Sequence, residues 1–151
     1  MKRSQQLAPL SREHHRVLLL ARALMRDGNT ALRDALPTRL EERRAHVLAA
    51  CAHDVEPHLQ LEEQAFSVAR GKGPALERAL ARLDDEHREI RLLCAALHEI
   101  ADLDADLDAG LDALGVALEA HVRWEERTLF PLLESTLDPA SFATLASAVS
   151  R

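Results

Sequence analysis

Histidine and glutamate recur at the same spacing in two places along the chain. His58 precedes Glu62 by four residues, and His121 precedes Glu125 by four residues. Residues four apart in a helix lie on one face, one turn from each other. Each pair would therefore present an imidazole and a carboxylate in the same direction. This mixture of ligands suits iron, manganese or zinc.

Two further histidines fall in a second repeated motif. Leu10-Ser-Arg-Glu-His14-x-x-Val17 matches Leu83-Asp-Asp-Glu-His87-x-x-Ile90, and His58-x-x-x-Glu62-Glu63 matches His121-x-x-x-Glu125-Glu126. The chain thus contains an internal repeat, which predicts a twofold arrangement of two helix pairs. Such an arrangement would give each of two metal ions two imidazoles and let two carboxylates bridge them. The candidate metal ligands are His14, His58, Glu62, His87, His121 and Glu125.

Turn signals divide the chain into the helical segments that must position these residues. The predicted segments cover residues 11–26, 38–70, 74–101 and 109–135, with an aspartate-rich turn at 102–108 and a short helix after Pro139. Pro57 predicts a kink within the second segment. Apolar residues alternate at spacings of three and four in every segment, which is typical of helices packed in a bundle. The expected fold is all-α, an up-down-up-down antiparallel four-helix bundle with a short C-terminal helix, in a single domain over residues 1–151.

The four histidines are also expected to lie at one level of this bundle. His58 and His87 are almost equally far from the turn near Gly73, and Asp104 lies midway between His87 and His121. Ionisable side chains on an interior seam are costly unless they are paired or bind a metal. The matched levels therefore favour one shared metal site over four unrelated buried histidines.

Composition excludes several classes of partner. The net charge of −6 argues against nucleic acid, whose phosphates require a basic surface. No apolar run is long enough to span a membrane. The N-terminal residues 1–6 do not resemble a signal peptide, so a cytoplasmic location is expected. The two cysteines are then expected to be free thiols.

This pattern resembles the hemerythrin-like, cation-binding HHE family from about Leu7 to Glu134. The resemblance implies a non-haem di-iron centre of two iron ions, bridged by an oxo or hydroxo group and held by the six candidate ligands. Oxygen-carrying members have a second histidine one turn after the one on the third helix, where this chain has Arg91. A simple oxygen-carrier role is therefore not implied. The four-histidine, two-glutamate set is similar to di-iron proteins that repair iron–sulfur centres and to hemerythrin-like iron sensors.

The function expected from this resemblance is to bind or react with dioxygen, nitric oxide or peroxide, or to sense or handle iron. Any catalysis would be redox chemistry at the metals, because the sequence shows no nucleophile–base pair. The alternatives are a zinc- or manganese-binding bundle without oxygen chemistry, and a metal-independent helical module whose polar residues fix helix register. The oligomeric state stays open.

Three residue assignments also have alternatives. His15 is the substitute for His14, and Glu126 is the substitute for Glu125. Cys51 lies seven residues before His58 and Cys94 seven residues after His87, which places both thiols at one level in antiparallel helices. They are interpreted as ordinary buried cysteines, with a redox-active pair as the alternative.

Overall fold

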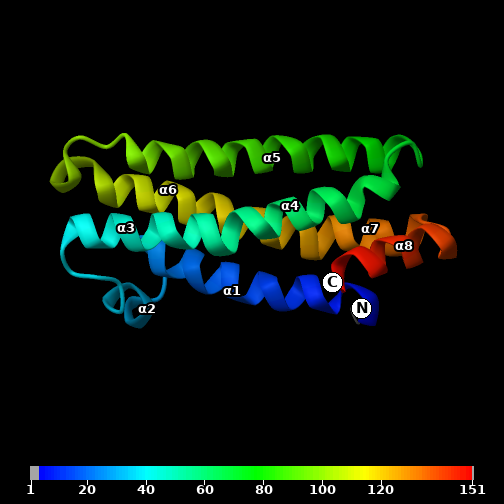
Figure 1. Cartoon of the computed structure of the whole chain (residues 1–151), viewed down its shortest axis with the longest axis horizontal. Helices are drawn as coiled ribbons and strands as arrows, with labels where there is room; N and C mark the ends of the chain where they lie inside the picture. Colours follow the sequence, from blue (N-terminus) through cyan, green and yellow to red (C-terminus); the bar gives the residue numbers. More distant parts are fainter. Residues whose placement is uncertain (1–3, 151) are drawn as a thin grey trace.

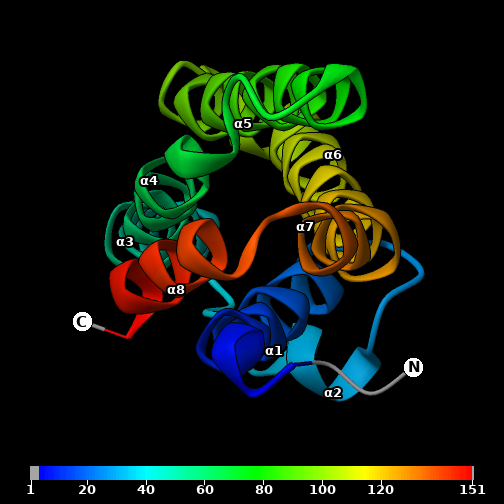
Figure 2. The same ribbon diagram turned by 90° about the vertical axis from the view of Figure 1, so that its right-hand side faces the viewer.

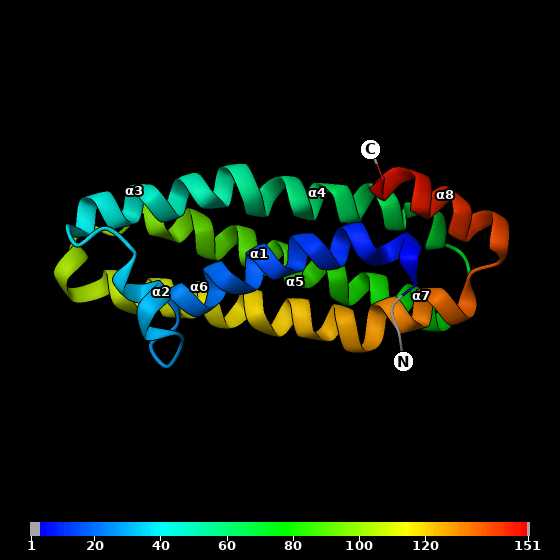
Figure 3. The same ribbon diagram turned by 90° about the horizontal axis from the view of Figure 1, so that it is seen from below.

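The computed structural model describes residues 4–150, which form a helical bundle without strands. Four long helical stretches run alternately up and down, so the predicted four-helix bundle is confirmed (Figures 1 and 3). The first stretch is α1 (Ala8–Leu24), which follows a 3-10 turn η1 (Gln5–Leu7), and a short helix α2 (Thr30–Asp34) lies in the connection after it.

The remaining stretches contain several helical elements each. The second comprises α3 (Leu40–Ala50), a π segment η2 (Cys51–Val55), α4 (Glu56–Ala65) and a 3-10 turn η3 (Phe66–Ala69). The third is α5 (Pro74–His98) alone. The fourth comprises α6 (Leu103–Trp124), a π segment η4 (Glu125–Leu129) and α7 (Phe130–Thr136), and α8 (Pro139–Val149) is the predicted C-terminal helix.

Seen along its axis, the bundle has its four stretches at the corners of a square (Figure 2). α5 lies opposite α1, and the α3–α4 stretch lies opposite α6–α7. α8 folds back to pack on α4, η3 and η1, and so covers the end of the bundle where the chain begins. Within residues 4–150 no helix is both long and apolar enough to cross a membrane. Residues 1–3, part of the stretch judged not to be a signal peptide, lie outside the described residues.

Each π segment is followed by one residue and then by a proline. The Glu56 amide donates to the carbonyl of Cys51, and the Phe130 amide donates to that of Glu125, in each case five residues back. Pro57 and Pro131 follow, and neither has an N–H for a regular helical hydrogen bond. The predicted irregularity at Pro57 is thus a widened turn, and the second copy of the repeat has its counterpart at Pro131.

The aspartate-rich turn predicted at 102–108 is wrong except at its first residue. Asp102 caps α6 by accepting a hydrogen bond from the Ala105 amide, and the helix begins at Leu103. The first turns of α6 extend past the end of α5 (Figure 1). This overhang keeps His121 level with His87, although the connection between the helices is not at their midpoint.

Two apolar clusters fill the bundle on either side of a polar layer. One cluster extends toward the α2 end and contains Leu24, Val47 and Leu114, all buried. The other extends toward α8 and contains Phe66 and Phe130. The six candidate ligands occupy the layer between the clusters, so the core excludes water from them on both sides.

α1 and α6 approach each other closely because Gly115 has no side chain. A Cβ atom at Gly115 would lie 2.7 Å from the carbonyl oxygen of Ala21 and 2.8 Å from Cγ of Met25. The backbones therefore meet where a larger residue would push them apart. This contact fixes the helix that carries His14 against the helix that carries His121.

Candidate metal centre

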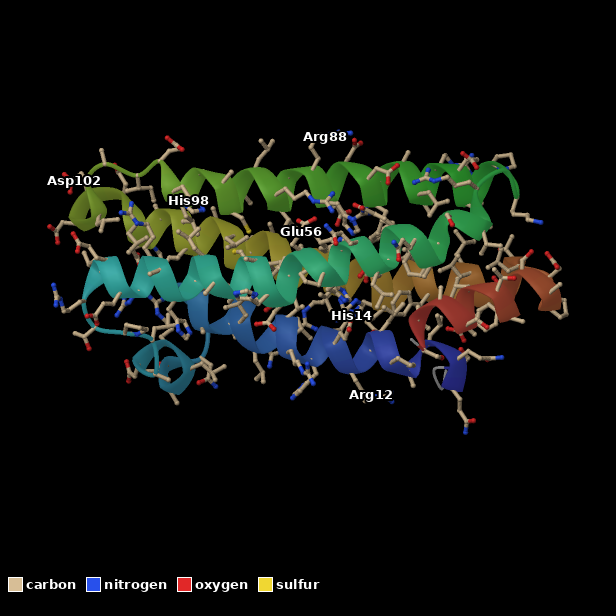
Figure 4. The ribbon with its side chains drawn as sticks, in the orientation of Figure 1. Arg12, His14, Glu56, Arg88, His98 and Asp102 are labelled. Carbon is tan, nitrogen blue, oxygen red and sulfur yellow. The ribbon has the colours of Figure 1, made fainter. Side chains whose placement is uncertain are left out.

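The six candidate ligands come together in the middle of the bundle. His14 is on α1, at mid-length of the bundle (Figure 4), and the others come from α4, α5, α6 and the start of η4. Every one is buried, with between 0% and 4% of its surface exposed. Such burial of six ionisable groups needs a compensating interaction.

The six residues form two groups that share both glutamates. His14 and His58 form one group with Glu62 and Glu125, and His87 and His121 form the other with the same two glutamates. Within each group, one potential ligand atom per residue lies within 4.8 Å of the others. This is the arrangement that the internal repeat predicts, with two imidazoles on each side and two carboxylates between.

All four imidazoles direct Nε2 toward the shared carboxylates. Nε2 of His14 lies 2.9 Å from Glu125, and Nε2 of His58 lies 2.8 Å from Glu62. On the other side, Nε2 of His87 lies 3.2 Å from Glu62, and Nε2 of His121 lies 3.4 Å from Glu125. Glu125 therefore contacts His121 on its own helical stretch and His14 from another. Glu62 contacts His58 on its own stretch and also Nε2 of the other three histidines, at 3.2–3.7 Å. The ring pairs repeat this symmetry, since His14–His58 and His87–His121 both have centroids 4.9 Å apart at 73°.

The outer nitrogen of every imidazole meets a carboxylate from outside the two groups. Nδ1 of His58 lies 2.7 Å from Glu13, and the repeat-related Nδ1 of His121 lies 3.2 Å from Glu86. An Nδ1–H that donates to a carboxylate leaves the Nε2 lone pair free to bind a metal and fixes the ring. The other two contacts join His14 to Glu126 at 2.8 Å and His87 to Glu63 at 2.9 Å.

The alternative ligands, Glu126 and His15, lie outside the two ligand groups. Glu126 lies behind His14, where it also accepts a hydrogen bond from the Ser11 hydroxyl, and is not in either ligand group. His15 is exposed on the surface of α1. The structure thus places His14 and Glu125 in the polar layer and their substitutes outside it.

Sequence reasoning missed the roles of Glu13 and Glu86. Each directly precedes a candidate ligand in the repeat, but its carboxylate reaches the histidine of the neighbouring helical stretch. The signal was present, because both copies of the repeat contain Glu-His. The glutamate of each Glu-His pair reaches across to a neighbouring helical stretch, and only the packed structure shows which imidazole it contacts.

The surrounding carboxylates favour protonated imidazoles in the metal-free site. Burial alone would lower the pKa of His14, but nearby carboxylates, Glu125 foremost, raise it to about 11. Burial likewise opposes charge on His58, whose pKa Glu62 and Glu13 raise to about 9. The pKa of His121 rises to about 10 despite burial, chiefly because of Glu125.

The pKa values of the two central glutamates, Glu62 and Glu125, are shifted in opposite directions. Burial disfavours a charge on Glu62, but His58 and the other imidazoles lower its pKa well below the usual value. Burial raises the pKa of Glu125, and the negative charge of Glu62 raises it further. Two carboxylates that face the same space resist simultaneous ionisation unless positive charge is supplied. A divalent cation on each side would supply it.

Unsatisfied buried atoms indicate that the site fits a metal. Among the described residues, Nε2 of His58, Nε2 of His121 and both carboxylate oxygens of Glu125 are buried without a hydrogen-bond partner. Their neighbours lie at ion-pair distances, but not in hydrogen-bond geometry. A buried polar atom without a partner costs about 1–3 kcal/mol. The four atoms are the nitrogen and oxygen types that bind iron, manganese or zinc.

Arg91 lies near the centre without entering it. Its guanidinium donates to both oxygens of Glu56 at 3.0–3.2 Å and to Glu63 at 2.7 Å. Glu63 in turn contacts Nδ1 of His87. Arg91 therefore holds the Glu63 carboxylate in place behind the candidate ligand His87. Ion pairs join Arg91 to both Glu63 and Glu56.

The bundle and its buried layer of imidazoles and carboxylates define a candidate metal-binding helical protein. A family model, the hemerythrin HHE cation binding domain, matches residues 5–133 and also residues 78–148. The first match contains all six candidate ligands, and the second falls on the second copy of the repeat. The chain belongs to this hemerythrin HHE cation-binding family. Neither the curated proteins nor the solved structures gave a significant match.

Proposed function

We propose that the chain holds two iron ions, one between His14 and His58 and one between His87 and His121. Glu62 and Glu125 would bridge them. The observation that carries this proposal is that the two ligand groups share both glutamates, while every imidazole directs Nε2 inward. Bridging carboxylates in a helical bundle favour a pair of iron or manganese ions over a single ion.

We infer that this centre binds or reacts with a small redox ligand, namely dioxygen, nitric oxide or peroxide, or that it senses or handles iron. The iron pair would supply the electrons for such chemistry. The protein's contribution is a water-poor site, since apolar clusters lie on both sides and Phe130 stacks on His14 at 5.2 Å. Arg91 stands where oxygen carriers have an additional histidine, and its ion pairs with Glu56 and Glu63 support a role other than simple oxygen carriage.

Two alternatives remain proposals of a different class. A zinc- or manganese-binding bundle would use the same residues without oxygen chemistry. A metal-independent module would use the polar layer only to fix helix register. The buried atoms of His58, His121 and Glu125 that lack hydrogen-bond partners favour metal binding over the second alternative, because register could be fixed by a fully satisfied network.

The compartment is part of the same proposal. We infer a cytoplasmic location for the chain, which the two unpaired cysteines support because thiols persist in a reducing compartment. The net charge of −6 supports small ligands over nucleic acid as partners.

The experiment that tests this function is anaerobic loading with ferrous iron followed by exposure to air. We expect new absorption bands in the near ultraviolet as the iron pair is oxidised, and a change in those bands on addition of nitric oxide or peroxide. A matched sample loaded with zinc should show neither change. Tight zinc binding together with iron that gives no response would overturn the oxygen chemistry and leave the metal site intact.

A further inference from the structure

Cys51 and Cys94 meet at a position that the metal proposal does not use. Cys51 opens the π segment η2, and Cys94 lies on α5, 43 residues later in the chain. Their sulfur atoms are 2.8 Å apart, and both are free thiols. The sequence predicted one level for the two residues, and the structure confirms it by placing them in contact.

The contact is close to the geometry of a disulfide. A disulfide bond is about 2.05 Å long, so the sulfurs need to approach by only about 0.75 Å to form one. The bond would join the second helical stretch to α5. No cluster of potential metal ligands among residues 4–150 includes either sulfur, which argues against a thiolate metal site here.

Both cysteines line a cavity of about 280 Å³ between α3–α4 and α5. Apolar side chains such as Leu48, Val55 and Ile90 form its walls, and the Glu56–Arg91 ion pair lies at its polar side. The volume accommodates a small molecule. Cys94 is partly exposed and Cys51 is 7% exposed, and both residues border the cavity.

The two thiols are chemically unequal. The Cys94 thiol donates a hydrogen bond to the sulfur of Cys51. This hydrogen bond lowers the pKa of Cys51 against the opposing effect of burial, and it raises the pKa of Cys94. The pair thus contains one sulfur favoured as the nucleophile and one held beside it as a thiol.

We propose that Cys51 and Cys94 form a redox-active dithiol, which a small hydroperoxide entering this cavity oxidises to a disulfide. The Cys51 thiolate attacks the terminal peroxide oxygen; the O–O bond breaks, the leaving oxygen takes a proton as water or alcohol, and Cys51 becomes a sulfenic acid. The Cys94 sulfur then attacks that sulfur and forms the S–S bond as the S–O bond breaks, and the Cys94 proton leaves with the displaced hydroxide as water. Two electrons pass from the thiols to the peroxide, and a dithiol reductant returns them by exchange.

The test is a thiol count on the purified full chain, carried out with and without bound metal. We expect two free thiols per chain before hydrogen peroxide is added and none after it. The mass should fall by about 2 Da for the two hydrogens lost, and dithiothreitol should restore both thiols. The result should be the same in both metal states, because the proposal does not depend on the metal centre.

Single variants identify the order of events. Cys94→Ser should leave the sulfenic acid on Cys51 open to a dimedone label, whereas Cys51→Ser should react with peroxide much more slowly. Each variant keeps a residue of similar size, and circular dichroism checks that the bundle is folded. Two thiols that persist in wild-type protein under excess peroxide, or disulfides that form only between chains, would overturn the proposal.

Discussion

Nδ1 of His87 lies 2.9 Å from the carboxylate of Glu63, which the guanidinium of Arg91 contacts at 2.7 Å. His87 itself is fully buried, whereas Glu63 and Arg91 are each about a third exposed. The Glu63 carboxylate thus fixes the outer edge of the His87 ring, and the Arg91 guanidinium in turn fixes Glu63. The repeat-related carboxylate, Glu126, holds His14 but takes a hydrogen bond from the Ser11 hydroxyl.

We predict that Glu63→Ala weakens metal binding without unfolding the bundle. Loss of a carboxylate behind a metal-binding histidine lowers metal affinity by about 10–100-fold, because the ring is no longer held and its nitrogen is less basic. Glu63→Gln should recover part of the loss, since the amide oxygen still accepts from Nδ1. Competition with a chromogenic chelator measures the affinity.

The matched control for this change is Glu89→Ala, which removes an exposed glutamate from α5. It alters net charge by the same amount as Glu63→Ala and should leave metal affinity unchanged. Equal affinities for Glu63→Ala and the wild type would show that this contact does not support a ligand.

Local sequence periodicity predicts much of the candidate metal centre, and helix packing determines the rest. The four-residue spacing of His58 and Glu62 fixes their common direction within one helix, and the repeat supplies the twofold relation. The contact between Glu13 and Nδ1 of His58 joins two helices through residues that are 45 apart in the chain, so local sequence spacing does not predict it. The overhang of α6 is likewise set by packing.

Irregular helix geometry was predicted at one proline and missed at the other. Pro57 indicated a break, whereas Pro131 lay near the expected end of its segment and attracted no prediction. The π segment before Pro131 begins at Glu125 itself. A π turn shifts the residues after it around the helix, whereas Glu125 at its start keeps the regular four-residue spacing from His121.

We predict that metal binding releases protons at neutral pH. The pKa values of His14, His58 and His121 are raised to between about 9 and 11 in the metal-free site, so these imidazoles are protonated at pH 7. A metal needs the deprotonated Nε2, and binding must expel the proton. The release should be greatest at neutral pH, well below all three pKa values, and should diminish as the pH rises from about 9 to about 11.

Calorimetry of zinc binding in buffers of different ionisation enthalpy measures this release. The apparent binding enthalpy should depend on the buffer at pH 7, and metal affinity should increase with pH. His15→Ala removes the exposed neighbour of His14 and should leave the proton count unchanged. A binding enthalpy independent of buffer at pH 7 would contradict the prediction.

We predict that Gly115→Ala destabilises the bundle. The new Cβ would lie 2.7 Å from the Ala21 carbonyl oxygen, a backbone atom that cannot move without shifting α1. Overpacking costs about 1–3 kcal/mol, whereas the helix propensity gained by replacing glycine with alanine returns about 1 kcal/mol. The net result should be a lower free energy of unfolding in urea.

Gly110→Ala is the control on the same helix. Its nearest atoms are the side-chain ends of Leu97 at 3.0 Å and Ile100 at 3.3 Å, which can move aside. The same gain in helix propensity should then leave stability unchanged or increased. If both variants unfold at the same urea concentration, the close approach of α1 and α6 does not limit stability.

The central claim is that two metal ions share Glu62 and Glu125, and the metal content of three proteins tests it most directly. After anaerobic iron loading and removal of excess metal, the wild type should retain two ions per chain. His58→Ala should lose the ion beside His14 and retain one, while Glu62→Ala should lose both.

His53→Ala, an exposed histidine of the same helical stretch, should retain two ions and controls for nonspecific loss. Circular dichroism checks that each variant is folded. Two ions in the wild type, one in His58→Ala and none in Glu62→Ala are the result we predict. One ion or none in the wild type, or two ions retained by Glu62→Ala, would contradict a shared two-metal centre.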